Sequence, residues 1–218
     1  MDHPDVSMMY VVHKVFRRDL ARMQAAAAQA VDPDVQKALR DCWATFNQYL
    51  IVHHTAEDET LWPPMRAKLN GRGQDLGLLT EMVDEHSRLD PLLHEIDDTL
   101  HQASPAHLTG LFANLAHVLV GHFEHEEKAA LPLVQQTLSA NEWKAFGDDQ
   151  RRRIGLRGAG WFFPWLLDGA APDMRDFVLA HVPPPVRMVH RLIWEPRYRR
   201  RSPWRRIPTL QTGTAEAS

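Results

Sequence analysis

Apolar side chains recur at steps of three and four residues through the first two thirds of the chain, which is the spacing of an amphipathic helix. Proline, glycine and capping residues separate one such stretch from the next. The pattern therefore predicts four long helices, over roughly residues 5–30, 33–63, 75–104 and 105–137. Ser139 and Glu142 then predict a capping box for a shorter fifth helix.

Short connections between long helices favour antiparallel neighbours, so we expect an all-α fold built on an up-down-up-down four-helix bundle. Charge divides the chain unevenly. Residues 1–146 carry 12 Lys+Arg against 21 Asp+Glu, whereas residues 147–218 carry 13 Arg and no Lys against 7 acids. We place a boundary near Gly147, between the bundle with its fifth helix and a C-terminal Arg/Trp/Pro-rich extension of short helices that packs on it.

Ionisable residues interrupt the apolar stripes of all four helices. The residues that stand where core residues belong are His13, His53, Glu57, His86, His122 and Glu126. Burying an unpaired carboxylate costs several kcal/mol, and no Lys or Arg lies on these stripes to compensate. A metal is the natural source of the missing positive charge. Imidazole with carboxylate suits iron, manganese or zinc, and two carboxylates able to bridge favour a pair of ions, with iron the usual occupant in helix bundles.

Two of these pairs belong to an internal repeat. His53 with Glu57, and His122 with Glu126, are each followed by a proline at the tenth position after the histidine. Residues four apart lie about 40° from each other on a helix, so each pair faces one neighbour. An isolated pair is typical of an exposed helix surface. Two copies on two core stripes indicate a shared metal centre instead.

The whole arrangement resembles the hemerythrin-like, or HHE cation-binding, family over roughly residues 8–137. A lone His on the first helix, His-x-x-x-Glu on the second, Glu-His on the third and His-x-x-x-Glu on the fourth carry the resemblance, with Leu-Trp-Pro and Ala-Leu-Pro closing the two copies. It implies two non-haem iron ions with bridging carboxylates, which react with dioxygen, peroxide or nitric oxide. By motif position, the implied terminal ligands are His13, His53, His86 and His122, and Glu57 and Glu126 would bridge.

One departure concerns the third helix. Oxygen-carrying hemerythrins place two histidines there, four residues apart, but the positions four before and four after His86 hold Met82 and Asp90. The chain therefore looks more like the iron-responsive, redox or stress members than like reversible oxygen carriers.

His54 is the remaining candidate ligand. On the helical wheel Glu57 falls between His53 and His54, so a bridging Glu57 would have one imidazole on each side. His54 with His86 and His122 would then hold one iron, and His13 with His53 the other. The competing interpretation makes His54 a supporting or surface residue, because groups behind the ligands are routine around metals.

Asp58 and Glu59 are expected to be surface charges. The other polar residues of the bundle are expected to be solvated or to pack beside the helices: His94, His101, His107, His117, His125 and Glu127. The one cysteine, Cys42, excludes an intrachain disulfide and suits a reducing cytoplasm. The amino terminus has no apolar secretory segment, so we expect a cytoplasmic protein.

The C-terminal extension contains an aromatic stretch at residues 158–169, which we expect to cover a bundle face or to form a homodimer contact. Contact with a membrane surface is the alternative. A proline spacer leads to one short helix, expected at 186–194, and an Arg-rich run, 197–206, which we expect to dock on the acidic bundle. That run has no recognisable nucleic-acid-binding fold, so nucleic acid is not an expected partner. Residues from about 207 onwards are expected to be disordered.

Three functional classes remain open. The first is a diiron protein that senses, stores or buffers through an open iron position. The second is an oxidoreductase on the same centre, which removes peroxide as a catalase does or oxidises a substrate. The third is an interaction module whose metal only stabilises the bundle. Centres of this ligand type usually keep open positions, which disfavours the third.

Overall fold

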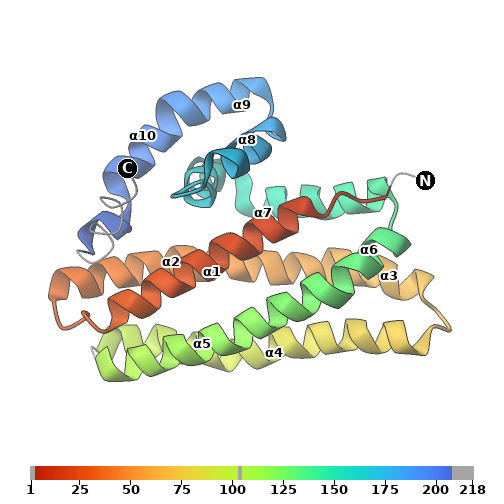
Figure 1. Ribbon diagram of the computed structural model, residues 1–218, viewed down its shortest axis with the longest axis horizontal. Coiled ribbons are helices and arrows are strands. Elements are labelled where there is room, and N and C mark those ends of the chain that lie inside the picture. The colour runs from red at the N-terminus through yellow and green to blue at the C-terminus, as the bar shows by residue number, and fades with distance from the viewer. Residues whose placement is uncertain (1–2, 103–104, 208–218) are drawn as a thin grey trace.

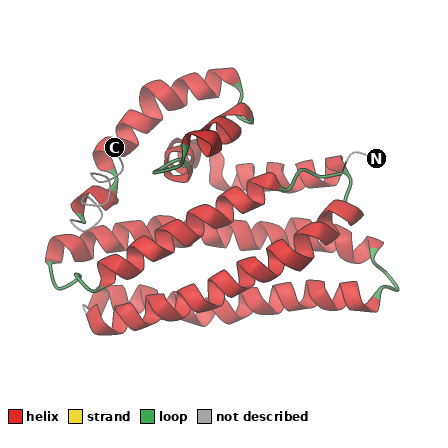
Figure 2. Ribbon diagram, in the orientation of Figure 1, coloured by secondary structure: helices red, strands yellow, loops and turns green. Residues whose placement is uncertain are grey.

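The computed structural model describes residues 3–102 and 105–207. Within these ranges every regular element is a helix (Figure 2). We call four of them the core helices: α1 (Ser7–Ala27), α2 (Pro33–Ala56), α4 (Gly73–Gln102) and α5 (Pro105–His125). α1 contacts α2 and α5, and α4 contacts the same two helices, so the four close a ring. Figure 1 shows the chain reversing direction at each connection between them.

Two of the core helices continue through π-helical turns. α2 leads into η1 (Glu57–Leu61) and α3 (Trp62–Lys68), and α5 leads into η2 (Glu126–Ala130) and α6 (Leu131–Thr137). The expectation that the second helix ends at its proline pair was wrong. Pro63 lies in the first turn of α3, directly after the π turn, a position in which a helix tolerates proline.

The interior contains two apolar clusters with a polar layer between them. Along α2 and η1, Leu50 belongs to the first cluster and Leu61 to the second. Along α4, Leu89 belongs to the first and Met82 to the second. His53 and Glu57 lie between Leu50 and Leu61, and His86 lies between Met82 and Leu89. The centre of the core helices is therefore where their buried polar side chains meet.

The remaining elements are the C-terminal helices: α7 (Ala140–Leu166), α8 (Pro172–Ala180), α9 (Pro184–Val189), η3 (His190–Trp194), α10 (Glu195–Arg201) and η4 (Pro203–Arg206). The capping box at Ser139 and Glu142 is confirmed. The helix that it starts passes through Gly147 and stops at Gly155, whose backbone is not helical and whose φ of 65° favours glycine. This first segment of α7, 140–154, is shorter than the core helices, as expected, and a second segment, 156–166, follows the break. The helix expected at 186–194 extends further, as one helical stretch from 184 to 201.

The C-terminal helices pack on the core helices through aromatic residues. Trp165 is 1% exposed, belongs to the first apolar cluster and donates its indole N–H to the buried Asp19 carboxylate at 2.7 Å. Arg18 donates to the carbonyls of Trp165 and Asp168. Ile207 is also buried, so it is an ordered part of the core, while residues 208–218 lie outside the described chain. Among the described residues, no helix is long and apolar enough to cross a membrane.

Candidate metal centre

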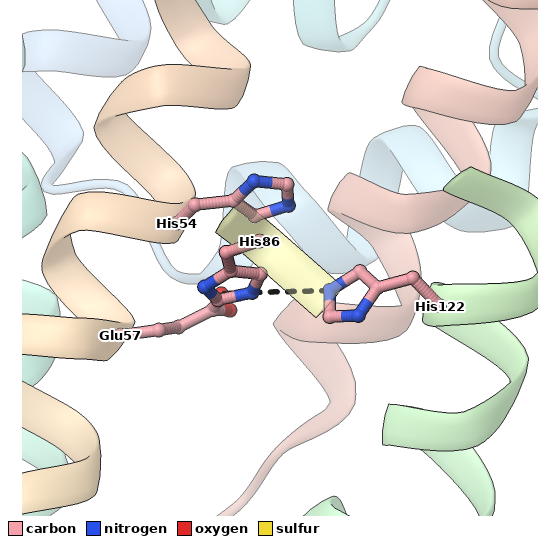
Figure 3. A group of neighbouring side chains, drawn as sticks. All are labelled: His54, Glu57, His86 and His122. Atoms are coloured by element: carbon pink, nitrogen blue, oxygen red, sulfur yellow. Dashed lines mark hydrogen bonds and ion pairs between the residues drawn. The ribbon is translucent and has the colours of Figure 1, made fainter. Parts of the chain in front are cut away.

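Two groups of buried side chains occupy the polar layer between the core helices. The first contains His54, Glu57, His86 and His122, and the second contains His13, His53, Glu57 and Glu126. Within each group one ligand atom from every residue lies within 4.8 Å of the others. Figure 3 shows the first group, in which imidazoles from α2, α4 and α5 point towards one another beside the Glu57 carboxylate. All seven residues named from the sequence therefore meet in one place.

Glu57 belongs to both groups. Its Oε1 lies 3.1 Å from His53 Nε2, and its Oε2 lies 3.5 Å from His86 Nε2. Glu126 Oε2 lies 3.1 Å from His13 Nε2. Both carboxylates are fully buried, and apart from these imidazole contacts none of their four oxygens has a hydrogen-bond partner among the described residues. Desolvated oxygens of this kind are costly unless a cation or a proton satisfies them.

The imidazoles of the first group meet through their Nε2 atoms. His86 Nδ1 lies 2.9 Å from Asp58 Oδ1, and His122 Nδ1 lies 2.8 Å from Glu85 Oε2. An ionised carboxylate only accepts, so each Nδ1 carries a proton and each neutral imidazole presents an Nε2 lone pair. These two Nε2 atoms are 3.2 Å apart. His54 Nε2 is also buried with no hydrogen-bond partner in the described chain. A metal ion would accept all three lone pairs at once.

The second group has the same construction. His13 Nδ1 lies 2.9 Å from Glu127 Oε1, and its Nε2 lies 3.1 Å from His53 Nε2. Arg17 holds the Glu127 carboxylate with both terminal nitrogens, at 2.6 and 3.2 Å. The imidazole of His13 is thus oriented from behind, with its second nitrogen directed at the buried carboxylates. Carboxylates placed behind a histidine in this way fix its tautomer and ring orientation for metal binding.

The placement of Asp58 and Glu127 corrects the expectation that Asp58 is a surface charge and Glu127 a solvated or packing residue. Each points away from its own motif face, but each reaches the lone histidine of a neighbouring core helix. His125 was also expected to be a simple surface or packing residue, and its Nδ1 lies 2.8 Å from Glu85 Oε1. Asp58 and Glu127 both directly follow the motif glutamate, so the repeat marks them as equivalent positions, but it does not show which histidine each of them reaches.

The two halves of the centre differ at one position. His54 stacks on His86 with ring centroids 4.1 Å apart and 10° between the planes. Phe123, the corresponding residue of the second copy, stacks on His13 at 4.2 Å and 16°. Each lone histidine is therefore covered by the residue that follows a motif histidine, but only one of these covering residues is itself a potential ligand. The result is a group with three imidazoles and a group with two.

Burial and neighbouring charges set the protonation of the centre. Burial lowers the pKa of His53 and His54 well below the usual range, and the other imidazoles add to the shift. Burial also raises the pKa of Glu57 well above its usual value, with a further contribution from Glu126. Burial opposes ionisation of Glu126 as well, but the adjacent His13 imidazole brings the pKa of Glu126 below its ordinary value. Burial opposes protonation of His13, but the carboxylates of Glu126 and Glu127 outweigh it and raise the pKa of His13. Because histidine binds metals as the neutral imidazole, His53 and His54 favour that form already, whereas a metal at His13 would displace a proton.

A family model matches residues 5–134, the Hemerythrin HHE cation binding domain. The chain belongs to this family. No curated protein and no solved structure gives a significant match. The matched range includes all seven residues of the two groups. It also includes the three carboxylates that contact the histidines from behind, Asp58, Glu85 and Glu127. It ends before the C-terminal helices, so these lie outside the part of the chain that the hemerythrin family model describes.

Proposed function

We propose that this hemerythrin-like protein binds two non-haem iron ions, and that the centre reacts with dioxygen, peroxide or nitric oxide in redox, oxygen or iron sensing or in stress protection. In this proposal the core helices form the family's up-down-up-down four-helix bundle, and the C-terminal helices are an extension that covers one side of it. Cys42 is a buried free thiol, which is in keeping with a cytoplasmic location.

The observation that carries the proposal is the facing pair of Nε2 atoms of His86 and His122. Their Nδ1 atoms are committed to carboxylates, so without a cation the two lone pairs oppose each other at 3.2 Å. One of the imidazoles would otherwise have to carry a second proton inside a buried site. Metal coordination satisfies both nitrogens and also the unpartnered Nε2 of His54.

The ligand assignment follows the two groups. His54, His86 and His122 would hold one ion, and His13 and His53 the other. Glu57 would bridge, since it places one oxygen toward each group. Glu126 belongs by distance to the group with two histidines. We assign it as the second bridge by its motif position, supported by two buried oxygens that, apart from the His13 contact, have no hydrogen-bond partner in the described chain.

Bound iron would supply redox-active positions for small oxidising or nitrogen-oxide ligands. The chain's own residues define what surrounds them. Phe123 and Phe16 are fully buried and pack against the imidazoles of His13 and His53, respectively, which keeps water from that side. Asp58, Glu85 and Glu127 keep the protons on Nδ1 and so direct Nε2 inward.

The third helix provides one histidine rather than two. Met82, four residues before His86, is buried in the second apolar cluster, and Asp90, four residues after it, is exposed. In this protein His54 would provide the third imidazole from α2 instead. Because the third helix lacks the second histidine of the oxygen carriers, we do not propose reversible oxygen carriage for this protein.

An oxidoreductase on the same centre is the alternative, and one experiment separates the two. The protein is loaded with Fe(II) without oxygen, then mixed with dioxygen, with peroxide or with nitric oxide while its optical spectrum and the peroxide concentration are followed. A persistent spectral change without turnover supports binding or sensing. Rapid catalytic loss of peroxide supports the enzyme. No spectral change and no turnover with any of the three would overturn both.

A further inference from the structure

The outer side of the helical stretch 184–201 combines exposed aliphatic side chains with arginines. Met188, Leu192 and Ile193 are 60%, 66% and 57% exposed. Met188 and Leu192 are four residues apart, so they lie one turn apart on the same side of the helix. The exposed arginines of this stretch are Arg187, Arg191, Arg197, Arg199, Arg200 and Arg201. We call the three aliphatic residues with these arginines the outer face.

The opposite side of the same stretch is fixed to the protein by its aromatic residues. Trp194 stacks on Phe163 at 6.2 Å with 2° between the planes, and Tyr198 packs on Trp161 at 4.8 Å. Both rings thus pack against α7 and are not presented on the outer face. The outer face is thus a preformed surface on an anchored helix. Figure 1 shows α9 and α10 along the edge of the molecule opposite α4 and α5, where no other described element covers them.

Charge on this stretch is strongly positive and largely uncompensated. Residues 184–201 contain six arginines and one acid, Glu195. Arg175 and Arg199 both pair with Glu195, and Arg206 reaches Asp41 on α2. The other arginines of the outer face make no ion pair within the described residues. The expected docking of the Arg-rich run on the acidic core helices is therefore made by Arg206 and not by the outer face.

We propose that the outer face binds the surface of an anionic lipid bilayer. Aliphatic residues flanked by arginines on one helix match the two contributions that hold an amphipathic helix in a bilayer interface: insertion of apolar side chains and attraction to acidic headgroups. A nucleic acid would satisfy the arginines but would leave the aliphatic residues in water, and the rings suited to stacking on bases are turned inward. A second copy of this chain would satisfy the aliphatic residues but would bring two arginine clusters together.

The test is cosedimentation of the full-length protein with vesicles of phosphatidylcholine alone and of equal parts phosphatidylcholine and phosphatidylglycerol. Binding is expected with the anionic vesicles and not with the neutral ones, and it should fall as salt is raised. The double substitution of Arg191→Gln and Arg197→Gln should weaken binding to anionic vesicles about thirtyfold. The double substitution of Met188→Ser and Leu192→Ser should weaken it about tenfold or more.

Matched controls remove equivalent groups elsewhere. Lys37→Gln with Arg88→Gln removes two exposed charges from α2 and α4, and Val31→Ser with Ile51→Ser removes two exposed aliphatic side chains. Both should bind as the wild type does, and thermal melting checks that every variant is folded.

The proposal is overturned by equal binding to neutral and anionic vesicles, or by equal losses in the controls. It is also overturned if the Met188/Leu192 variant binds normally, or if duplex DNA or RNA binds more tightly than vesicles. Self-association abolished by the aliphatic substitutions, without vesicle binding, would assign the face to a dimer and overturn the proposal as well.

Discussion

Replacing both buried glutamates of the metal centre tests how metal binding is coupled to folding. Glu57 and Glu126 are 0% exposed, and without a cation their charges would repel each other in a medium of low dielectric constant. Glu57→Gln with Glu126→Gln removes this repulsion and also removes the proposed bridges. The metal-free variant should therefore melt above the metal-free wild type, and iron should stabilise it far less.

The size of the effect follows from mass action. An ion present at one hundred times its dissociation constant adds about 2.7 kcal/mol to the folded state, so two ions add about 5 kcal/mol. For a domain of this size each kcal/mol shifts the melting temperature by about 2–4 °C. Iron should then raise the melting temperature of the wild type by roughly 10–20 °C, and that of the double variant by only a small part of this.

Calorimetry or circular dichroism with and without iron measures the gap. The matched control is Glu59→Gln with Glu124→Gln, which removes two exposed carboxylates from the same two helical stretches and should keep the wild-type gap. Within the described part of the chain, the contact that this control loses is the surface ion pair between Glu59 and Arg153, which contributes little. Equal melting temperatures of the wild type with and without iron, or an undiminished gap in the double glutamine variant, would refute the reasoning.

Further predictions concern single residues of the centre. His54→Ala should lower iron retention and shift the charge-transfer spectrum as strongly as His86→Ala, whereas full iron content with an unchanged spectrum would make His54 a supporting residue. Glu127→Gln should weaken iron binding about 10–100-fold in a chelator competition, and Glu124→Gln should leave it unchanged. Equal affinities would contradict the role given to the carboxylate behind His13. In metal-free protein, burial holds the pKa of His54 well below its ordinary value of 6.5. Below pH 6.5 the His54 imidazole therefore binds a proton in the unfolded chain but not in the folded one, and stability is lost as the pH falls. Denaturant unfolding of His54→Phe should show a gain over the wild type that grows by about 2 kcal/mol between pH 7 and pH 5, and a gain that does not change with pH would contradict this.

The helical period of the sequence was enough to find the residues of the centre. Helix geometry places Glu57 between His53 and His54, and the two groups in the structure have that arrangement. His53, His54 and Glu57 belong to one helical stretch, so the relative directions of their side chains follow from sequence spacing alone. Whether His54 is a ligand stays a prediction that only metal-bound protein can test.

The partners behind the histidines could not be found in the same way. The contact of Asp58 with His86, and that of Glu127 with His13, joins two different helices, so it depends on how those helices pack. The π turns that begin at Glu57 and Glu126 also change the direction of the following residues, and α-helical spacing does not describe them. The change in charge near Gly147 predicts a domain boundary there, and this stays a prediction. The helix that begins at Ala140 passes through Gly147, because charge balance does not break a helix.

The most direct test of the central claim is the metal content of the full-length protein expressed in iron-replete cells and purified without chelators. The account predicts close to two iron ions per chain, because the seven buried residues form two groups joined by Glu57. Less than one equivalent of any transition metal in a well-folded sample would contradict it.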